Sequence, residues 1–348
     1  SSFMGGVLRS DTLSPVGMAV VGVFALTNAL AGFFLIVLVN KHSGQISIIN
    51  DHVGSIPCYI RQQTDGSVSI SDNLPALAAT QPPLAAQAMF NYLFFHCIPS
   101  PLSIYQGISK LEPGVIAAVD SSGTLQQQCY YQPTFTPSPD STEQLMLRCR
   151  ELISEAVRRN ATDDCAAFLS GGLDSSTVAG MLAQHSHNSG HGSGQNAKTY
   201  SIGFEAKGYD ETEYALITAK HFGSNHQVHY LKPAEIVDNF VEVAGYFDEP
   251  FGNSSAMAAF ICASVAKQQG VSVMLAGDGG DEIFAGNERY AKQKVFEHYQ
   301  QVPALLRSPL ELLLHSPLGK LPGFSKARSY VQQANMPLPD RLDSYNFL

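Results

Sequence analysis

The segment Phe168–Gly180, FLSGGLDSSTVAG, surrounds one aspartate with glycines and serines directly after an apolar run. If a strand ends here and a helix begins, the turn offers unpaired backbone N–H groups and the positive end of the helix dipole, which suit a phosphate. The glycines let the backbone approach a ligand closely, and the serines add hydroxyl donors. We predict an anion-binding turn, with a plain glycine-rich strand-to-helix connection as the alternative. Its expected donors are Ser170, Gly171, Gly172, Ser175 and Ser176.

The aspartate of this segment, Asp174, needs its own explanation, because a carboxylate beside a polyphosphate is repelled unless a cation lies between them. Mg²⁺ bridging carboxylate and phosphate oxygens resolves that conflict. A second acidic segment, DGGDE at Asp278–Glu282, follows another apolar run further along the chain. Alone it is more often a surface turn, but two neighbouring strand ends could hold one divalent ion from both sides. The absence of a GxxxxGK[ST] pattern argues against a P-loop that cleaves the γ-phosphate.

Alternating strands and helices are predicted to position both loops. Ser141 and Gln144 form a capping-box pattern, and apolar residues then recur at helical spacing on one face. That face comprises Leu145, Cys149, Leu152, Ile153 and Ala156. Helices are also expected after Asp174 and at about Glu211–Phe222. The predicted strands are Ala166–Leu169, Thr199–Phe204, His226–Leu231 and Val271–Gly277. This order predicts an α/β domain with a parallel sheet and helices on both faces.

Residues 1–130 have a β-rich pattern of short apolar runs separated by turns, with one helix expected at Gln87–Phe95. The segment Gln132–Asp140 holds three prolines, which is typical of a linker. We therefore predict a first domain at 1–130, a linker at 131–143 and a second domain at 144–348. The predicted strands are FFLIVLV (33–39), QISIIN (45–50), CYIRQQ (58–63), SVSIS (67–71) and VIAAVD (115–120).

The uncharged stretch Val16–Val39 is long enough to span a bilayer. Against that, Thr27 and Asn28 sit in its middle and glycines interrupt it. Its second half also reads as a strand joined to the next one by a glycine-containing turn. We expect a buried hairpin and no membrane partner, with membrane insertion as the alternative.

The amino-acid composition argues against some classes of protein function. The formal net charge of −9 argues against a general nucleic-acid binder, because phosphate contacts need clustered Lys and Arg. The six cysteines lack a CxxC pair, so we expect small buried hydrophobes in a reducing cytosol. The Gly/Ser-rich stretch His185–Asn196 predicts a mobile surface loop. Its His185, His187 and His191 could be offered as metal ligands, but solvated loop side chains are favoured.

Four segments in order carry a resemblance: SGGLDSS, YSIGFEAKGYDETEYA (Tyr200–Ala215), FDEPFGNSSA (Phe247–Ala256) and LAGDGGDEIFAGNERY (Leu275–Tyr290). Together they resemble the synthetase domain of glutamine-hydrolysing asparagine synthetase, of the ATP-pyrophosphatase group. The resemblance implies an adenine nucleotide α-hydrolase-like fold, ATP and Mg²⁺ as cofactors, and aspartate and ammonia as substrates. It also implies ATP cleavage between the α- and β-phosphates, a carboxylate activated as an acyl-adenylate, and attack by ammonia.

Carried over by position, the resemblance implies roles for single residues. Asp174 and Asp281 match the Mg²⁺-associated aspartates. Asp278 stands where many members have the longer Glu, and Asp278 and Asp281 are the expected catalytic residues. The segment Glu249–Ser255 should face the amino-acid substrate, with Asn253, Ser254 and Ser255 as candidates. The residues expected around the pyrophosphate are Ser170, Gly171, Gly172, Asp174, Ser175 and Ser176, and those expected around the adenosine are Phe168, Ile202, Ala276 and Gly277.

Residues 32–130 are similar, less strongly, to the family's glutaminase domain, an N-terminal-nucleophile sandwich that opens on a cysteine. This chain opens on Ser1, and no cysteine precedes Cys58. We also find no Asn-Gly-Glu or arginine counterpart for holding glutamine, and Ser1 is a weak candidate for a substitute nucleophile. We expect a truncated glutaminase remnant that releases no ammonia from glutamine, followed by a synthetase domain that is incomplete at its carboxyl end.

The leading hypothesis is an ATP-dependent, amide-forming ligase of the asparagine-synthetase type. One alternative is an adenylating cyclase of the β-lactam synthetase or lasso-peptide type, since such relatives also lack the glutaminase cysteine. Another is a non-catalytic nucleotide-binding paralogue. As partners we expect small molecules and no nucleic acid, with a homodimer as one option and a cytoplasmic location.

Overall fold

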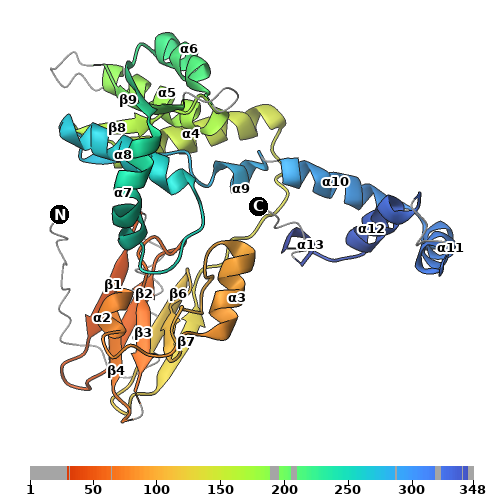
Figure 1. Cartoon of the computed structure of the whole chain (residues 1–348), viewed down its shortest axis with the longest axis horizontal. Helices are drawn as coiled ribbons and strands as arrows, with labels where there is room; N and C mark the ends of the chain where they lie inside the picture. Colours follow the sequence, from red (N-terminus) through yellow and green to blue (C-terminus); the bar gives the residue numbers. More distant parts are fainter. Residues whose placement is uncertain are drawn as a thin grey trace. The chain divides into compact units, whose positions relative to one another are not determined.

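The structure is a computed structural model that describes residues 30, 32–63, 65–188, 196–204, 210–286, 288–317, 323–338 and 340–343. Contacts between residues divide the chain into two compact units. The first comprises the chain up to Ser138 together with Ala244–Asn253, and the second comprises Pro139–Val243 and the chain from Ser254 onward. Figure 1 labels most helices and strands of both units.

The first unit contains two antiparallel sheets, with the strand orders β1-β2-β6-β7 and β4-β3-β5. Helices α2 and α3 accompany them (Figure 1). The elements are β1 (Leu35–Val39), β2 (Ile46–Asn50), β3 (Tyr59–Gln62), β4 (Val68–Ser71), α2 (Leu74–Leu77), α3 (Ala86–Phe95), β5 (Ile108–Lys110), β6 (Val115–Val119) and β7 (Leu125–Cys129).

The core of the first unit is formed by strands of both sheets. Ile48 of β2, Ile60 of β3 and Ala117 of β6 are buried in one apolar cluster. The five predicted strand runs and the helix at Gln87–Phe95 are confirmed. Strands β5 and β7 and helix α2 are additional to the prediction. β5 and α2 are very short, and β7, LQQQC, is a mostly polar, exposed strand at the edge of its sheet, so apolar patterning does not reveal them.

The predicted hairpin is present as β1 and β2, which pair from Leu35–Asn50 to Val39–Ile46. It is only partly buried: β2 ends in fully buried residues, whereas edge strand β1 leaves Val37 and Val39 exposed. Within the described part of the chain, no helix is long and apolar enough to cross a membrane. Residues 16–29 of the uncharged stretch lie outside the described residues, as does Ser1.

The second unit holds a four-stranded parallel sheet with the order β10-β9-β8-β11. The predicted α/β class is confirmed. The elements from this part of the chain onward are α4 (Thr142–Asn160), β8 (Cys165–Phe168), α5 (Leu173–Asn188), β9 (Lys198–Phe204), α6 (Thr212–Phe222), β10 (Asn225–Leu231), α7 (Pro233–Tyr246), α8 (Ser255–Gln268), β11 (Val273–Leu275), α9 (Gly280–Phe284), α10 (Glu288–Gln301), α11 (Ala304–His315), α12 (Ser325–Ala334) and α13 (Asp340–Asp343).

Helices cover both faces of the parallel sheet, as predicted, because successive side chains of a strand point to opposite faces. Ala167 of β8 packs in a cluster with residues of α4, α5 and α6. Its neighbour Ala166 packs in another cluster with Cys262 and Ala266 of α8. In Figure 1, β8 and β9 accordingly lie among α4, α5, α6 and α8. Phe168, two residues after Ala166, shares the face covered by α8.

Helix α4 begins at the predicted capping box. The Ser141 hydroxyl accepts a hydrogen bond from Gln144 N (3.3 Å), and Gln144 Oε1 accepts one from Ser141 N (2.9 Å). The buried side of the helix differs from the predicted face: Val157 is buried, whereas Leu145 and Leu152 are 42% and 54% exposed. The Pro-rich segment 132–140 contains neither helix nor strand, and α4 begins at Thr142, inside the predicted linker.

Three local predictions are wrong. Helix α5 continues to Asn188, so His185 and His187 lie in its last turn rather than in a loop, and His191 lies outside the described residues. Strand β11 spans only Val273–Leu275, because the chain turns at the glycines that follow. The cysteines are not uniformly buried: Cys58 and Cys262 are, but Cys129 is exposed and its thiol donates to the Tyr131 carbonyl.

Candidate functional site

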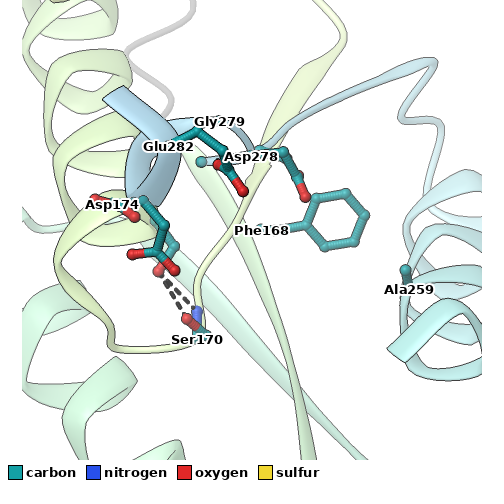
Figure 2. A pocket seen from close by; sticks show the side chains of 11 residues that line it. Phe168, Ser170, Asp174, Ala259, Asp278, Gly279 and Glu282 are labelled. Atoms are coloured by element: carbon teal, nitrogen blue, oxygen red, sulfur yellow. Dashed lines mark hydrogen bonds between the residues drawn. The ribbon is translucent and has the colours of Figure 1, made fainter. Parts of the chain in front are cut away.

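A cavity of about 410 Å³ opens at the carboxyl ends of β8 and β11 (Figure 2). Its volume lies in the range of small-molecule sites, and the carboxyl edge of a parallel sheet is where such sites form. Its wall is formed by the end of β8, by the turns after β8 and β11, and by residues of α5, α8 and α9. The lining residues are Phe168, Ser170, Asp174, Ser175, Ala259, Ala276, Gly277, Asp278, Gly279, Asp281 and Glu282.

The turn from β8 into α5 is held by its own serines. Ser175 Oγ accepts a hydrogen bond from Ser170 N (3.2 Å), and the two hydroxyls lie 2.9 Å apart, as the dashed lines in Figure 2 show. Gly172 N donates to Ser170 Oγ (3.3 Å). The first N–H groups of a helix have no partner within the helix, so the start of α5 presents donors beside these hydroxyls. Donors arranged in this way suit an anion.

Gly171 is the residue that makes this turn tight. Its φ of +90° lies in the left-handed region, and a Cβ there would lie 2.7 Å from the backbone nitrogen of Ala215 in α6. Any side chain would therefore both strain the backbone and push α6 away.

The loop after β11 approaches Asp174 through glycines. A Cβ on Gly280 would lie 2.5 Å from Asp174 Cγ, and a Cβ on Gly277 would lie 2.8 Å from Asp174 Cβ. The absence of side chains at these two positions lets the two loops touch directly. Asp174 therefore lies against the residue that precedes Asp281, and both aspartates line the same cavity.

The cavity carries a strongly negative lining. Asp174, Asp278, Asp281 and Glu282 contribute four carboxylates, and no Lys, Arg or His is among the described lining residues. Such a lining repels a polyphosphate unless divalent cations accompany it. Among the described residues, no group of three or more His, Cys, Asp or Glu is arranged to hold a metal ion. Mg²⁺ is usually bound by one or two carboxylates and completed by phosphate oxygens and water.

The opposite side of the cavity is apolar. The Phe168 ring lies between the acidic loop and Ala259 of α8 in Figure 2, and Ala276 lies at the start of the second loop. An aromatic face with small neighbours gives a flat ring room to lie against it. The cavity thus has an acidic, donor-rich end and an apolar end.

Eight of the twelve predicted site residues line the cavity, and four do not. Ser176 instead contacts α6, with its hydroxyl 3.2 Å from Thr218 Oγ1. Ile202 packs in the apolar cluster with Cys262. Gly171 and Gly172 form the turn behind the lining residues Ser170 and Ser175. The segment Glu249–Ser255 also contributes no lining residue, and its Glu249 belongs to the first unit.

Three lining residues have no role in the sequence analysis: Ala259, Gly279 and Glu282. Gly279 and Glu282 fall inside the acidic segment, so their motif already pointed to them. For Ala259 the sequence offered only an indirect indication. It precedes the sheet-facing residues Cys262 and Ala266 of α8 by one and two helical turns, so it lies on the same face of the helix. Extending that face toward the start of the helix places Ala259 beyond the strand end.

The fold and the cavity define an α/β protein with an acidic small-molecule site at the carboxyl edge of a parallel sheet. The chain belongs to the asparagine synthase family, whose model matches residues 148–345. A glutamine amidotransferase domain model matches residues 16–131.

Two relatives illustrate the similarity. Asparagine synthetase [glutamine-hydrolyzing] 1 of Bacillus subtilis is 26% identical over 315 residues, covering 90% of this chain and 48% of that protein. Putative asparagine synthetase [glutamine-hydrolyzing] 2 of Methanocaldococcus jannaschii is 31% identical over 286 residues, covering 79% and 53%. The chain therefore spans about half the length of these curated relatives.

Among solved structures, the NH3-dependent NAD synthetase of Campylobacter jejuni matches with 13% identity and a TM-score of 0.27. The match covers 57% of this chain and 98% of that one.

Proposed function

We propose that this chain is an ATP-dependent ligase that forms an amide bond, of the asparagine-synthetase type. In the first step, an oxygen of the aspartate side-chain carboxylate attacks the α-phosphorus of ATP. The bond between the α-phosphorus and the bridging oxygen breaks, which gives aspartyl-AMP and pyrophosphate. In the second step, ammonia attacks the acyl carbon, AMP leaves, a proton is lost, and asparagine is formed.

One observation carries this proposal: the serine-rich turn after β8 and the acidic turn after β11 line one cavity, with Asp174 in contact distance of Gly280. A phosphate-binding turn and a pair of aspartates are the two components that handling a magnesium polyphosphate requires. Membership of the asparagine synthase family supports the same reaction.

The donor-rich end of the cavity is assigned to the pyrophosphate. The hydroxyls of Ser170 and Ser175, with the N–H groups at the start of α5, would hold the β- and γ-phosphates as the leaving group departs. Asp174 and Asp281 would hold Mg²⁺, which supplies positive charge to the leaving pyrophosphate. The protein's contribution is then positioning and charge screening, so no side-chain nucleophile is required.

The apolar end is assigned to the adenosine. Phe168 and Ala276, with Ala259 across the cavity, provide the surface for the base. Asp278 also lines the cavity, and its carboxylate is our candidate to accept the proton that the attacking ammonia loses.

The proposal is tested by incubating the protein with ATP, Mg²⁺, aspartate and ammonium, and by separating the products. We expect AMP, pyrophosphate and asparagine in equal amounts. ADP and phosphate, or no aspartate-dependent product, would overturn the proposal. A parallel mixture with glutamine in place of ammonium tests whether the first unit releases ammonia. Pyrophosphate release that requires another carboxylate would instead point to an adenylating cyclase.

A further inference from the structure

The segment Ala244–Asn253 belongs to the first unit, although the chain on both sides of it belongs to the second. It connects the end of α7 to the start of α8 at Ser255. Contacts that hold this segment also restrain the residues at which α8 begins, because the two are adjacent in the chain.

Glu249 is the centre of that anchor. Its carboxylate forms an ion pair with the Lys110 ammonium group of β5, and its Oε1 accepts a hydrogen bond from Ile104 N at 2.7 Å. The Lys110 ammonium also donates to the carbonyl of Ile98. The Lys110 and Glu249 side chains are only 13% and 10% exposed.

Two neighbours of Glu249 add contacts within the first unit. Asp248 Oδ2 accepts a hydrogen bond from Leu74 N (3.0 Å). Gly252 N donates to the His96 carbonyl (2.8 Å), and a Cβ on Gly252 would lie 2.8 Å from His96 Cβ. Burial raises the pKa of Tyr59, and the nearby carboxylates of Glu249 and Asp248 raise it further. The neutral phenol therefore remains a hydrogen-bonding partner for Asp248.

A buried ion pair contributes little net stability, because desolvation offsets the attraction, but loss of one partner leaves the other charge buried and unpaired. Such a pair therefore selects one arrangement of the chain rather than strengthening the unit as a whole. Here the arrangement that it selects is the path of residues 244–253.

Helix α8 follows this segment directly, and its first turn is not capped by the side chain of its N-cap residue. Its N-cap residue, Ser254, forms no side-chain capping hydrogen bond. By contrast, α4 begins at a complete capping box. Ala259, one turn into α8, lines the cavity.

We propose that the Lys110–Glu249 ion pair is a positioning device: by holding residues 244–253, it restrains the start of α8, the helix that follows them in the chain and carries Ala259 of the cavity wall. The pair touches no substrate; it acts by holding the connection that leads into the helix. Its consequence for nucleotide binding rests on the proposed function, whereas its consequence for the order of α8 does not.

Amide hydrogen exchange on the whole chain tests the device without any nucleotide. Glu249→Gln keeps the shape of the side chain and removes its charge, and Lys110→Met removes the other partner. We expect exchange in a peptide covering Ala256–Cys262 to be about tenfold faster in both variants, with α10 and α12 as internal references. Glu112→Gln and Lys41→Met change the same charges at exposed positions and should leave exchange unchanged.

Unchanged exchange in α8, together with faster exchange confined to residues 98–112, would overturn the proposal. Gly252→Ala provides a second approach, because it disturbs the same segment without altering a charge; it should also loosen α8. The charge-reversed pair Lys110→Glu with Glu249→Lys should restore part of the protection lost in either single reversal.

The affinity of the variants for Mg²⁺-ATP is the second measurement that tests the positioning role. The dissociation constant of Mg²⁺-ATP should rise at least about threefold in Glu249→Gln and stay at the wild-type value in Glu112→Gln. An unchanged affinity beside loosened α8 would overturn the link to the cavity wall. If the wild-type chain itself binds no ATP, the proposed function fails, and the exchange result still decides whether the ion pair holds α8.

Discussion

The Asp174 carboxylate lies directly against Gly280: a Cβ on that glycine would be 2.5 Å from Asp174 Cγ and 2.6 Å from Oδ2. The turn after β8 and the turn after β11 therefore meet without a side chain between them. This contact explains why two segments far apart in the sequence line one cavity, and it makes the glycine as important as the aspartate.

Gly280→Ala should damage the site while leaving the fold intact. The new methyl group must displace either the Asp174 carboxylate or the β11 turn, because it cannot coexist with both. We expect the affinity for Mg²⁺-ATP to fall about tenfold, equivalent to about 1.4 kcal/mol, as measured by titration calorimetry. Gly323→Ala, where a Cβ meets nothing within 4 Å, is the matched control. Equal behaviour of the two variants would contradict the contact.

Asp278 offers a test of the second chemical step. Asp278→Asn keeps the size of the side chain but cannot accept a proton, so turnover should fall by about 10²-fold with little change in ATP affinity. Asp278→Glu restores a carboxylate and should stay within about tenfold of the wild-type rate. Steady-state kinetics with varied ATP and ammonium separates the two effects. A fully active Asp278→Asn variant would remove this residue from the mechanism.

His226 predicts a pH dependence of stability. Its imidazole lies 2.9 Å from Thr199 Oγ1 and 3.2 Å from Ser201 Oγ. Burial lowers its pKa, and a hydrogen bond with Thr199 opposes that effect only in part. Between the lowered pKa and the ordinary value of 6.5, the unfolded chain binds more protons than the folded one, so stability decreases as the pH falls through this window.

We therefore expect the free energy of unfolding of the wild-type chain to fall, relative to that of His226→Gln, as the pH is lowered from about 7.5 to about 5. Denaturant titrations at several pH values measure this difference. A difference that is constant with pH, or one that grows in favour of the wild type at low pH, would show that His226 is not buried in neutral form.

The capping box of α4 gives a prediction about stability alone. Ser141→Ala removes the side-chain acceptor for Gln144 N, which should lower the free energy of unfolding by about 1 kcal/mol. Ser141→Asp retains an acceptor and should restore most of that loss. Thermal and denaturant unfolding report the change, and nucleotide affinity should be the same in all three proteins because the cap does not line the cavity.

Local patterns in the sequence predicted the four strands of the parallel sheet and helices α4, α5 and α6, because strands and helices alternate there. They gave no bounds for α7–α13. The two loops were predicted as well, because glycine, serine and aspartate at two strand ends of one sheet suit a phosphate and its cation. The buried side of α4 was not predicted, because Leu145 and Val157 look alike until the sheet against which they could pack is known.

Contacts between residues that are far apart in the chain could not be predicted from the sequence. Nothing in FDEPFGNSSA indicates that Glu249 pairs with Lys110, 139 positions earlier in the chain, because an ion pair has no periodic signal. The position of Ala259 in the cavity wall depends in the same way on how α8 lies on the sheet. Residues whose roles depend on packing therefore emerge only from the three-dimensional structure.

The proposed ligase reaction requires that Asp174 and Asp281 hold one cation together with the nucleotide. Mn²⁺ binding to the chain in the presence of a non-hydrolysable ATP analogue, followed by electron paramagnetic resonance, measures this directly. We predict that Asp174→Asn and Asp281→Asn each weaken Mn²⁺ binding by about tenfold or more, and that the double variant loses much less than the sum of both. Wild-type Mn²⁺ affinity in both single variants, equal to that of the exposed control Asp163→Asn, would contradict the account.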